Sequence, residues 1–227
     1  MEYEKIYDRT KLLIGEAALE KLKKASVTVC GVGGVGSYVV EALARIGIGN
    51  ITVIDKDVVD MTNINRQLIA DTKTIGMAKV EIAKERIQNI NPGIEVREIR
   101  GYIDASNVGE YLSGSDYVVD AIDSIESKLD VIKYAKENNI PVISSMGMAN
   151  KLNPLDIKVG DISKTEMCPL AKIIRKRLRD MHISKVKVVY SVEQPIKNES
   201  NVLGSVPFVP SVAGLVIASE VVKDIIK

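Results

Sequence analysis

The chain has few of the residues that most often bind zinc or form disulfides. Its 227 residues include one histidine, His182, and two cysteines, Cys30 and Cys168, which lie far apart in the sequence. A structural zinc site needs about four ligands with close pairs, so we do not expect one. A histidine-based triad would have to use His182 within a basic run, and any general base is therefore expected to be Asp, Glu or Lys. The two cysteines give no disulfide framework and are typical of a reducing compartment.

Long apolar segments are missing as well. The longest apolar run, near 212–218, is far shorter than the ~18 residues that span a bilayer, and the N-terminus lacks an apolar signal core. We therefore expect a cytoplasmic protein with no membrane partner. With 31 basic and 30 acidic residues and 46% hydrophobic residues, the composition predicts one globular domain over residues 1–227.

Short β-branched runs alternate with longer amphipathic stretches from Ser26 to Ser145. This alternation predicts an α/β fold in which crossover helices join parallel strands. The expected strands lie at about 26–31, 51–55, 94–99, 116–120 and 141–145, and the expected helices at about 34–46, 76–89 and 124–138, with a short one at 105–112.

Both ends of the chain depart from this alternation. Residues 1–25 form an N-terminal arm in which 15–24 favours a helix, and residues 146–227 form a C-terminal elaboration around the substrate site. We expect this elaboration to consist of a long irregular stretch, a helix beginning at Pro169, a strand at 185–191, a polar loop at 193–205 and a helix at 211–226.

A glycine-rich loop follows the first expected strand and opens a helix. Gly31, Gly33, Gly34 and Gly36 give the G-x-G-x-x-G spacing whose backbone N–H groups can contact phosphate. Asp55 ends the next strand, 24 residues after Gly31, where a carboxylate can bind a ribose hydroxyl. An adenine nucleotide is predicted, and the motif alone is most often that of an NAD-dependent oxidoreductase.

A polar segment beyond the second strand favours a triphosphate instead. It contains Asp57, Asn63, Asn65, Arg66 and Gln67, and it is followed by Lys79 at the start of a helix. Two cations at the carboxyl end of a strand can neutralise the charge that builds on pyrophosphate during adenylyl transfer. The alternative is that Arg66 and Lys79 are solvated surface charges.

A second carboxylate site follows the fourth expected strand. Of Asp120 and Asp123, we favour Asp123 as the residue that holds Mg²⁺ against phosphate oxygens. The alternative is that Asp123 caps the helix beginning near Ser124.

Basic residues concentrate in one part of the C-terminal third. The segment 164–187 carries a net charge of +6, which leaves −5 for the rest of the chain. Helical spacing places Leu170, Ile173, Ile174, Leu178 and Met181 toward the core and leaves Lys172, Arg175, Lys176 and Arg179 largely toward solvent. This stripe is a candidate contact with a nucleic-acid backbone, and the alternative is a solvated helix face.

Together these motifs resemble the ubiquitin-activating-enzyme-like (ThiF/MoeB/HesA) adenylyltransferase superfamily over roughly residues 5–150. The resemblance implies a doubly wound, Rossmann-like sheet that binds Mg·ATP and adenylates a carboxylate. It implies that Asp55 binds ribose, that Asn63, Arg66 and Lys79 bind phosphates, and that Asp123 binds the metal. Arg9 resembles an arginine that such enzymes contribute across a homodimer to the partner's ATP. We therefore expect the catalytic residues to be Arg66, Lys79, Asp123 and Arg9.

The C-terminal third extends the resemblance to the branch of tRNA threonylcarbamoyladenosine dehydratases. The similar stretches are 147–154, 164–171, 187–191 and 204–214. This branch implies ATP-dependent activation and cyclisation of a threonine carboxylate on the adenosine beside the anticodon, which needs no enzyme cysteine. The branch is also associated with a monovalent cation (Na⁺ or K⁺), and sulfur-transfer or electron-transfer proteins are open as further partners.

Three other functions compete with this one. Activation of the C-terminus of a ubiquitin-like sulfur-carrier protein is the first alternative, but such activators usually carry C-x-x-C pairs, which this chain lacks. An NAD-dependent oxidoreductase is the second. A non-catalytic RNA-binding module is the most distant, because it would not need Asp55, Arg66, Lys79 and Asp123.

Overall fold

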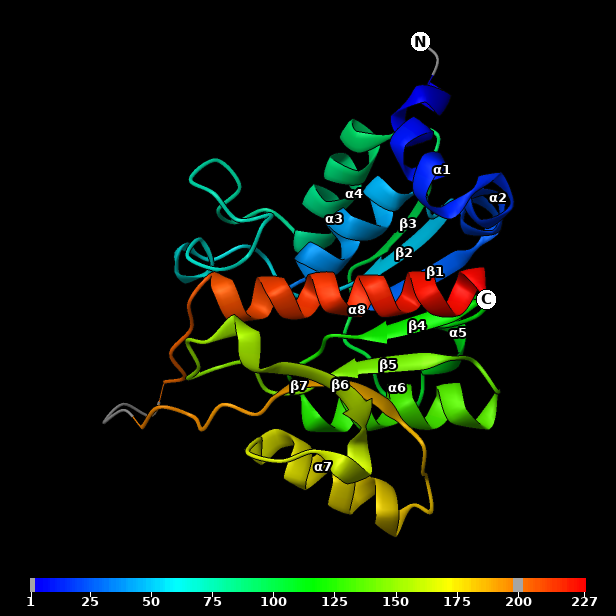
Figure 1. Cartoon of the computed structure of the whole chain (residues 1–227). Helices are drawn as coiled ribbons and strands as arrows, with labels where there is room; N and C mark the ends of the chain where they lie inside the picture. Colours follow the sequence, from blue (N-terminus) through cyan, green and yellow to red (C-terminus); the bar gives the residue numbers. More distant parts are fainter. Residues whose placement is uncertain (1–2, 198–201) are drawn as a thin grey trace.

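A seven-stranded sheet forms the centre of the molecule, which is described by a computed structural model over residues 3–197 and 202–227 (Figure 1). The strand order is β3-β2-β1-β4-β5-β7-β6, and all neighbours pair in parallel except β6 and β7. The mostly parallel α/β sheet expected from the sequence is confirmed. The strands are β1 (Ser26–Cys30), β2 (Asn50–Ile54), β3 (Glu95–Ile99), β4 (Tyr117–Asp120), β5 (Val142–Ser145), β6 (Ile157–Asp161) and β7 (Lys187–Ser191).

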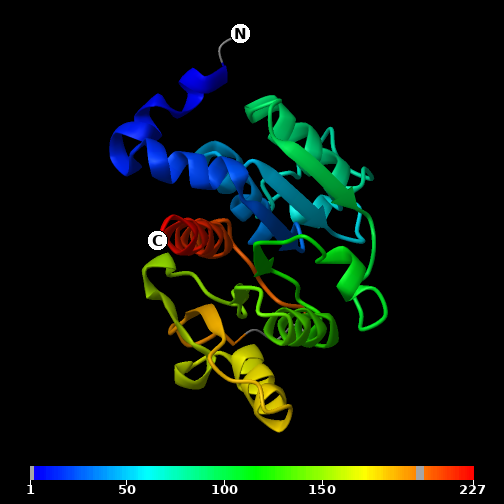
Figure 2. The same ribbon diagram turned by 90° about the vertical axis from the view of Figure 1, so that its right-hand side faces the viewer.

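Helices cover both faces of the sheet, so that α8 and α6 lie on opposite sides of it (Figure 2). On one face the apolar side chains of α3, α4 and α8 pack against alternate residues of β1 and β2, such as Val29 and Val53. On the other face α5 and α6 pack against the intervening residues, such as Cys30 and Ile54, and α7 packs on the outside of α6. The α-helices are α1 (Asp8–Ile14), α2 (Glu16–Lys24), α3 (Gly36–Ile46), α4 (Lys79–Ile90), α5 (Val108–Tyr111), α6 (Ile125–Glu137), α7 (Pro169–Asp180) and α8 (Phe208–Ile226).

The strand order reverses between β1 and β4, and this switch point determines where a ligand can bind. Strands β2 and β3 extend the sheet on one side of β1, and β4 and β5 extend it on the other. In open α/β sheets, ligands bind outside the carboxyl ends of the strands at such a switch point, because the loops that leave the two strands run in opposite directions there. Cys30 and Asp120 are partners in register, so the glycine loop and the β4–α6 turn begin side by side.

Several boundaries differ from those expected from the sequence. The stretch after Ser145 is not wholly irregular, because Ile157–Asp161 forms the edge strand β6. Helix α4 begins at Lys79 and not at 76, and α8 begins at Phe208 and not at 211. The N-terminal arm is helical, and it contains α1 in addition to the expected α2. None of the helices in residues 3–197 and 202–227 is long and apolar enough to cross a membrane.

Candidate active site

Two glycines fix the conformation of the glycine loop, and Gly33, between them, leaves space beside the backbone. Gly31 has a φ of +89°, and a Cβ there would lie 2.8 Å from the carbonyl oxygen of Ala121. A Cβ at Gly36 would overlap the carbonyl oxygen of Gly31. A Cβ at Gly33 would meet only the Gln67 amide nitrogen, at 3.8 Å. The outer glycines therefore set the tight turn, and Gly33 leaves room for a ligand beside the backbone.

Asp55 ties the glycine loop to the segment that follows β2. Its carboxylate accepts one hydrogen bond from the Val32 N–H (2.7 Å) and another from the Asp57 N–H (2.9 Å). The side chain is half-buried. Each carboxylate oxygen has a second lone pair, so a ribose hydroxyl can still donate to it at the position that the sequence predicts.

Lys79 presents a buried ammonium group at the same edge of the sheet. It begins α4, it is 6% exposed, and its Nζ lies 3.4 Å from the Asp57 carboxylate. Partial burial raises the pKa of Asp57, but the hydrogen bond from Lys56 and the charge of Lys79 outweigh it and lower that pKa overall. The burial of Lys79 contradicts the alternative that it is a solvated surface charge.

Residues 63–67 form the wall beside the glycine loop. The buried Asn63 accepts a hydrogen bond from the Asp60 N–H and thereby closes a turn. Arg66 donates to the Thr62 carbonyl oxygen (2.7 Å) and to Asn65 Oδ1 (3.0 Å). Its Cγ would lie 3.6 Å from a Cβ at Gly34, so the chain brings Arg66 to the open side of the loop.

Gln67 carries an acceptor that has no partner. Its side chain is 7% exposed, and its Oε1 is buried without a hydrogen bond among the described residues. A buried polar atom without a partner typically costs about 1–3 kcal/mol. The amide nitrogen of Gln67 is the atom that faces Gly33, so the side chain can offer a hydrogen-bond donor to a ligand on that side of the loop.

Asp120 and Asp123 have different roles although they share one turn. Asp120 is fully buried and pairs with the fully buried Lys128 of α6, at 2.7 Å. Lys128 also donates to the carbonyl oxygen of Ser145 (2.9 Å). Asp123 is exposed. The preference for Asp123 as the metal-binding residue therefore agrees with the burial of Asp120, and no side-chain capping hydrogen bond accompanies Ser124, the N-cap of α6.

Lys56 connects the carboxylates electrostatically. Its pKa is raised, first by the hydrogen bond to Asp57 and further by the negative charges of Asp55 and Asp123. The three carboxylates therefore lie around one cation at the carboxyl edge of β2 and β4. No group of three His, Cys, Asp or Glu able to hold a metal occurs in the described ranges.

A C-terminal segment closes the site on the side of α8. Asn65 donates to the Ser205 carbonyl oxygen (3.0 Å), and the Gly204 N–H donates to Asn150 Oδ1 (2.6 Å). A Cβ at Gly34 would lie 3.3 Å from Pro210 Cβ. Residues 204–210 thus join the phosphate end of the site to the loop after β5.

The remaining predicted residues lie elsewhere. Arg9 is exposed on α1, which projects from the part of the molecule where β1 begins (Figure 1). On α7, Lys172, Lys176 and Arg179 are exposed, but Arg175 is half-buried and donates to the backbone and hydroxyl oxygens of Thr165 (2.6 and 2.7 Å). Ile173 was expected in the core, but it is 45% exposed.

Sequence reasoning did not identify Lys128. A signal was present, because Lys128 lies among Leu129, Val131 and Ile132 on the buried side of α6. A lysine on an apolar helix face needs a buried partner, and Asp120 was available at the end of the preceding strand.

Comparison with known proteins agrees with this arrangement. The sequence matches the ThiF family over residues 7–227. The tRNA threonylcarbamoyladenosine dehydratase of Bacillus subtilis (strain 168) is 43% identical, with 97% of this chain and 94% of that protein aligned. The Escherichia coli tRNA N6-threonylcarbamoyladenosine dehydratase TcdA has been solved in complex with ATP and with AMP. Both structures have a TM-score of 0.94 and 38% identity, and they cover 98% of this chain and 94% of theirs.

A relative from another branch matches less of the chain. The adenylyltransferase and sulfurtransferase UBA4 of Saccharomyces cerevisiae (strain RM11-1a) is 34% identical, with 60% of this chain and 31% of that protein aligned. The resemblance inferred from the motifs is confirmed, since the match to the family extends through α8. The chain belongs to the ThiF family.

Proposed function

We propose that the chain is an ATP-dependent tRNA threonylcarbamoyladenosine dehydratase. The observation that carries this proposal is the end-to-end likeness to proteins of that name, which includes the C-terminal third. The adenylating half of the reaction is supported by the site itself, where the glycine loop, the buried Lys79 and the exposed Asp123 meet at one edge of the sheet.

Each residue has a role that follows from its position. The glycine loop contacts the phosphates, Asp55 binds the ribose, and Asn63, Asn65, Arg66, Gln67 and Asp57 line the rest of the nucleotide site. Lys79 and Arg66 neutralise the charge that develops on pyrophosphate, in a place where burial strengthens electrostatic stabilisation.

Mg²⁺ fits the donor set at Asp123. Mg²⁺ bound with a nucleotide usually takes one or two carboxylates, several waters and the phosphate oxygens, and Asp123 is an exposed carboxylate with a free approach. When bound, the metal would neutralise charge on the phosphates, and Asp123 would hold it at the β4–α6 turn.

The chemistry balances without an enzyme nucleophile. A carboxylate oxygen of the threonine attacks the α-phosphorus of ATP, and pyrophosphate leaves. The carbamoyl group of the same modified adenosine then attacks the activated carbonyl carbon, so that a ring closes, AMP leaves and a proton is released. The products are the cyclised nucleoside, AMP and pyrophosphate, and the nucleoside has lost one water.

The cysteines agree with this route. Burial raises the pKa of the Cys30 thiol well above its usual range, so it is a poor nucleophile. Cys168 is buried and caps α7, where its sulfur accepts a hydrogen bond from the Ala171 N–H (3.4 Å). The alternative, activation of a sulfur-carrier protein, is less supported because the relative named for such chemistry aligns with only 60% of the chain.

We also propose a homodimer in which Arg9 reaches the partner's nucleotide. The support is the N-terminal arm, where α1 has no buried residue and its Leu12 and Leu13 are 87% and 86% exposed. Two adjacent leucines in water at the surface favour a protein contact. A two-fold dimer places the same arm over both sites.

One experiment separates the candidate functions. The full chain is incubated with Mg·ATP and either tRNA that carries threonylcarbamoyladenosine, the same tRNA without the modification, or a protein ending in Gly-Gly. We expect AMP and pyrophosphate to form in equal amounts only with the modified tRNA. Turnover with the Gly-Gly protein alone, or tight binding of NAD in place of ATP, would refute the proposal.

A further inference from the structure

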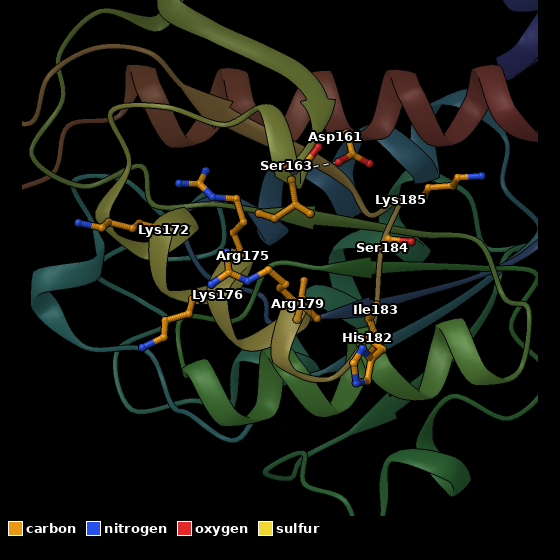
Figure 3. A pocket seen from close by; sticks show the side chains of 12 residues that line it. Asp161, Ser163, Lys172, Arg175, Lys176, Arg179, His182, Ile183, Ser184 and Lys185 are labelled. Carbon is orange, nitrogen blue, oxygen red and sulfur yellow. Dashed lines mark hydrogen bonds between the residues drawn. The ribbon is translucent and has the colours of Figure 1, made fainter.

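A cavity of about 930 Å³ lies between α7 and the end of β6. Figure 3 shows the side chains that line it. Four cationic side chains come from α7, namely Lys172, Arg175, Lys176 and Arg179. The connection from α7 to β7 adds His182 and Lys185, and Asp161 is the only carboxylate among the described lining residues. Asp161 is engaged in capping the short helix after β6, where it accepts a hydrogen bond from the Ser163 N–H (2.8 Å).

Most of these cations have no carboxylate partner. Among the described residues, Lys172, Lys176, Arg179 and Lys185 are exposed and form no ion pair. Arg177, on the same helix but outside the cavity, differs because both of its terminal nitrogens bind Glu126 at 2.9 Å. The cavity therefore collects unpaired positive charge in a chain whose remainder is negative, as an anionic ligand requires.

The inner wall of the cavity is aliphatic. Ile162 and Leu178 are buried, Ile183 is half-buried, and all three line the cavity. A row of exposed cations on a flat surface is enough to bind phosphates, so phosphate binding alone does not require a cavity. An apolar wall beneath a cationic rim fits a ligand that has both a charged group and a flat apolar face.

The rim also contains unusual backbone conformations. His182 and Lys185 have φ angles of +58° and +56°, in the left-handed region that non-glycine residues seldom occupy. The His182 N–H and the Ile183 N–H still donate to the carbonyl oxygens of Arg179 (3.0 Å) and Leu178 (2.9 Å). The connection is therefore tightly fixed against the end of α7, which keeps the cavity preformed.

The cavity opens at the edge of the sheet opposite to the nucleotide site. Asp161 pairs in register with Lys187, the first residue of β7, whereas the glycine loop and Asp123 follow the last residues of β1 and β4. A five-residue strand is roughly 15 Å long. The cavity cannot hold the reacting carboxylate or the ATP, and a substrate that reaches both sites must be a long polyanion.

We propose that this cavity binds one unpaired nucleotide of the tRNA substrate, distinct from the nucleotide that is modified. The base lies against the aliphatic wall and the guanidinium plane of Arg175, and the flanking phosphates lie on Lys172, Lys176, Arg179 and Lys185. Unpaired RNA bases are typically bound by stacking on aromatic rings or guanidinium planes. The inference rests on the proposed function, because it takes the tRNA as the polyanion.

The test compares RNA shapes with a variant that fills the cavity without changing its charge. Binding of a labelled RNA stem-loop and of a blunt RNA duplex of equal length is measured by fluorescence anisotropy, with the full chain and a non-hydrolysable ATP analogue. Ser184→Leu fills the cavity from one side and Ser163→Leu fills it from the other, and neither adds an aromatic ring on which a base could stack. Ser113→Leu, at an exposed turn outside the cavity, is the matched control.

We expect both filling variants to weaken binding of the stem-loop about tenfold or more, since one base contact is typically worth about that much. Binding of the duplex should stay unchanged. Lys176→Glu should weaken binding of both RNAs and lower the slope of log affinity against log salt concentration by about one. Lys24→Glu on α2 should change neither quantity. Unchanged stem-loop binding in both filling variants would overturn the proposal. An equal loss of affinity for the stem-loop and the duplex would also overturn it. So would displacement of the bound stem-loop by inorganic phosphate at the same concentration as the RNA.

The same preparations report on the proposed function separately. If modified tRNA still stimulates AMP formation by the unsubstituted chain while the filling variants bind RNA normally, only the cavity assignment fails. If modified tRNA never stimulates AMP formation, the proposed function fails whatever the binding results are.

Discussion

Single residues at the carboxyl edge of the sheet carry the charges that adenylation needs. Lys79 is the clearest of these, because its ammonium is buried beside Asp57 and opens the helix next to the phosphate end of the site. A buried cation stabilises a developing negative charge more strongly than the same cation does in solvent, because less water screens the interaction.

Replacing Lys79 therefore tests the electrostatic role directly. Lys79→Met keeps the volume and removes the charge, and we expect AMP formation to fall about 10²- to 10³-fold. The control is Lys84→Met on the same helix, which loses only a half-exposed ion pair with Glu98 and should keep its activity. Steady-state AMP release measures both variants, and unimpaired turnover by Lys79→Met would remove Lys79 from the mechanism.

The pair of Lys128 and Asp120 has a structural consequence. Lys128→Met leaves the Asp120 carboxylate buried and uncompensated, and loss of one partner of such a pair costs about 3–5 kcal/mol. We expect urea unfolding to show this loss, and we expect the double variant Lys128→Met/Asp120→Asn to recover part of it. A double variant no more stable than Lys128→Met would show that the pair is not coupled.

At the scale of elements, a charged cluster attaches α8 to the sheet. Asp224 of α8 accepts hydrogen bonds from Tyr117 of β4 (2.9 Å) and from Lys187 of β7 (2.6 Å). Burial raises the pKa of Asp224, but the hydrogen bonds from Lys187, Lys227 and Tyr117 dominate and lower it to about 2. Burial and the neighbouring Asp224 raise the pKa of Tyr117, which therefore stays a hydrogen-bond donor.

The low pKa of Asp224 predicts a pH-dependent stability. A carboxyl whose folded pKa lies below its unfolded value stabilises the fold above that unfolded value, near pH 4. It loses this contribution as the pH falls toward about 2. Asp224→Asn should lower the free energy of unfolding at pH 7 by about 1 kcal/mol, since solvent screens part of the interaction, and by much less at pH 2.5. Urea titrations at both pH values, with Glu137→Gln as an exposed control, test this, and a difference independent of pH would contradict it.

The elements that carry the nucleotide site could be predicted from the sequence, because each has a strong local signal. The glycine spacing needs a strand before it and a helix after it, and Asp55 ends the next β-branched run. Strand β6 could not be predicted, because the alternation of apolar and polar residues lasts only from 157 to 159 before Gly160 interrupts it. The hydrogen bond from Arg175 to Thr165 could not be predicted either, because it depends on how α7 packs against a loop ten residues earlier.

At the scale of the whole molecule, the proposed dimer brings two chains to each nucleotide site. Arg9→Ala and Asp123→Ala should each be inactive. If Arg9 acts on the partner's ATP, mixing the two inactive variants and letting their subunits exchange should restore about a quarter of the unsubstituted activity. Half of the dimers are then mixed, and each mixed dimer has one intact site of two. AMP release by the mixture is measured after subunit exchange. A mixture of the single variants Lys24→Glu and Asp123→Ala is the control. No recovery, or an active monomer in sedimentation, would contradict the arrangement.

The molecule also separates its chemistry from the cationic cavity beside α7. The nucleotide site lies at the carboxyl edge of β1 and β4, and the cationic cavity lies at the amino edge of β7. A long RNA can contact both edges, whereas a short peptide tail entering the nucleotide site would not reach the cavity. This arrangement favours a tRNA over a carrier-protein tail as the molecule that supplies the carboxylate.

The most direct test of the central claim is the mass of the modified nucleoside itself. tRNA that carries threonylcarbamoyladenosine is incubated with Mg·ATP and the full chain, and the nucleosides are then released under mild conditions and weighed by mass spectrometry. We predict that threonylcarbamoyladenosine loses the mass of one water, with one AMP formed for each nucleoside converted, and that Lys79→Met leaves it unchanged over the same time. ATP consumption with no change in the mass of that nucleoside would contradict the account.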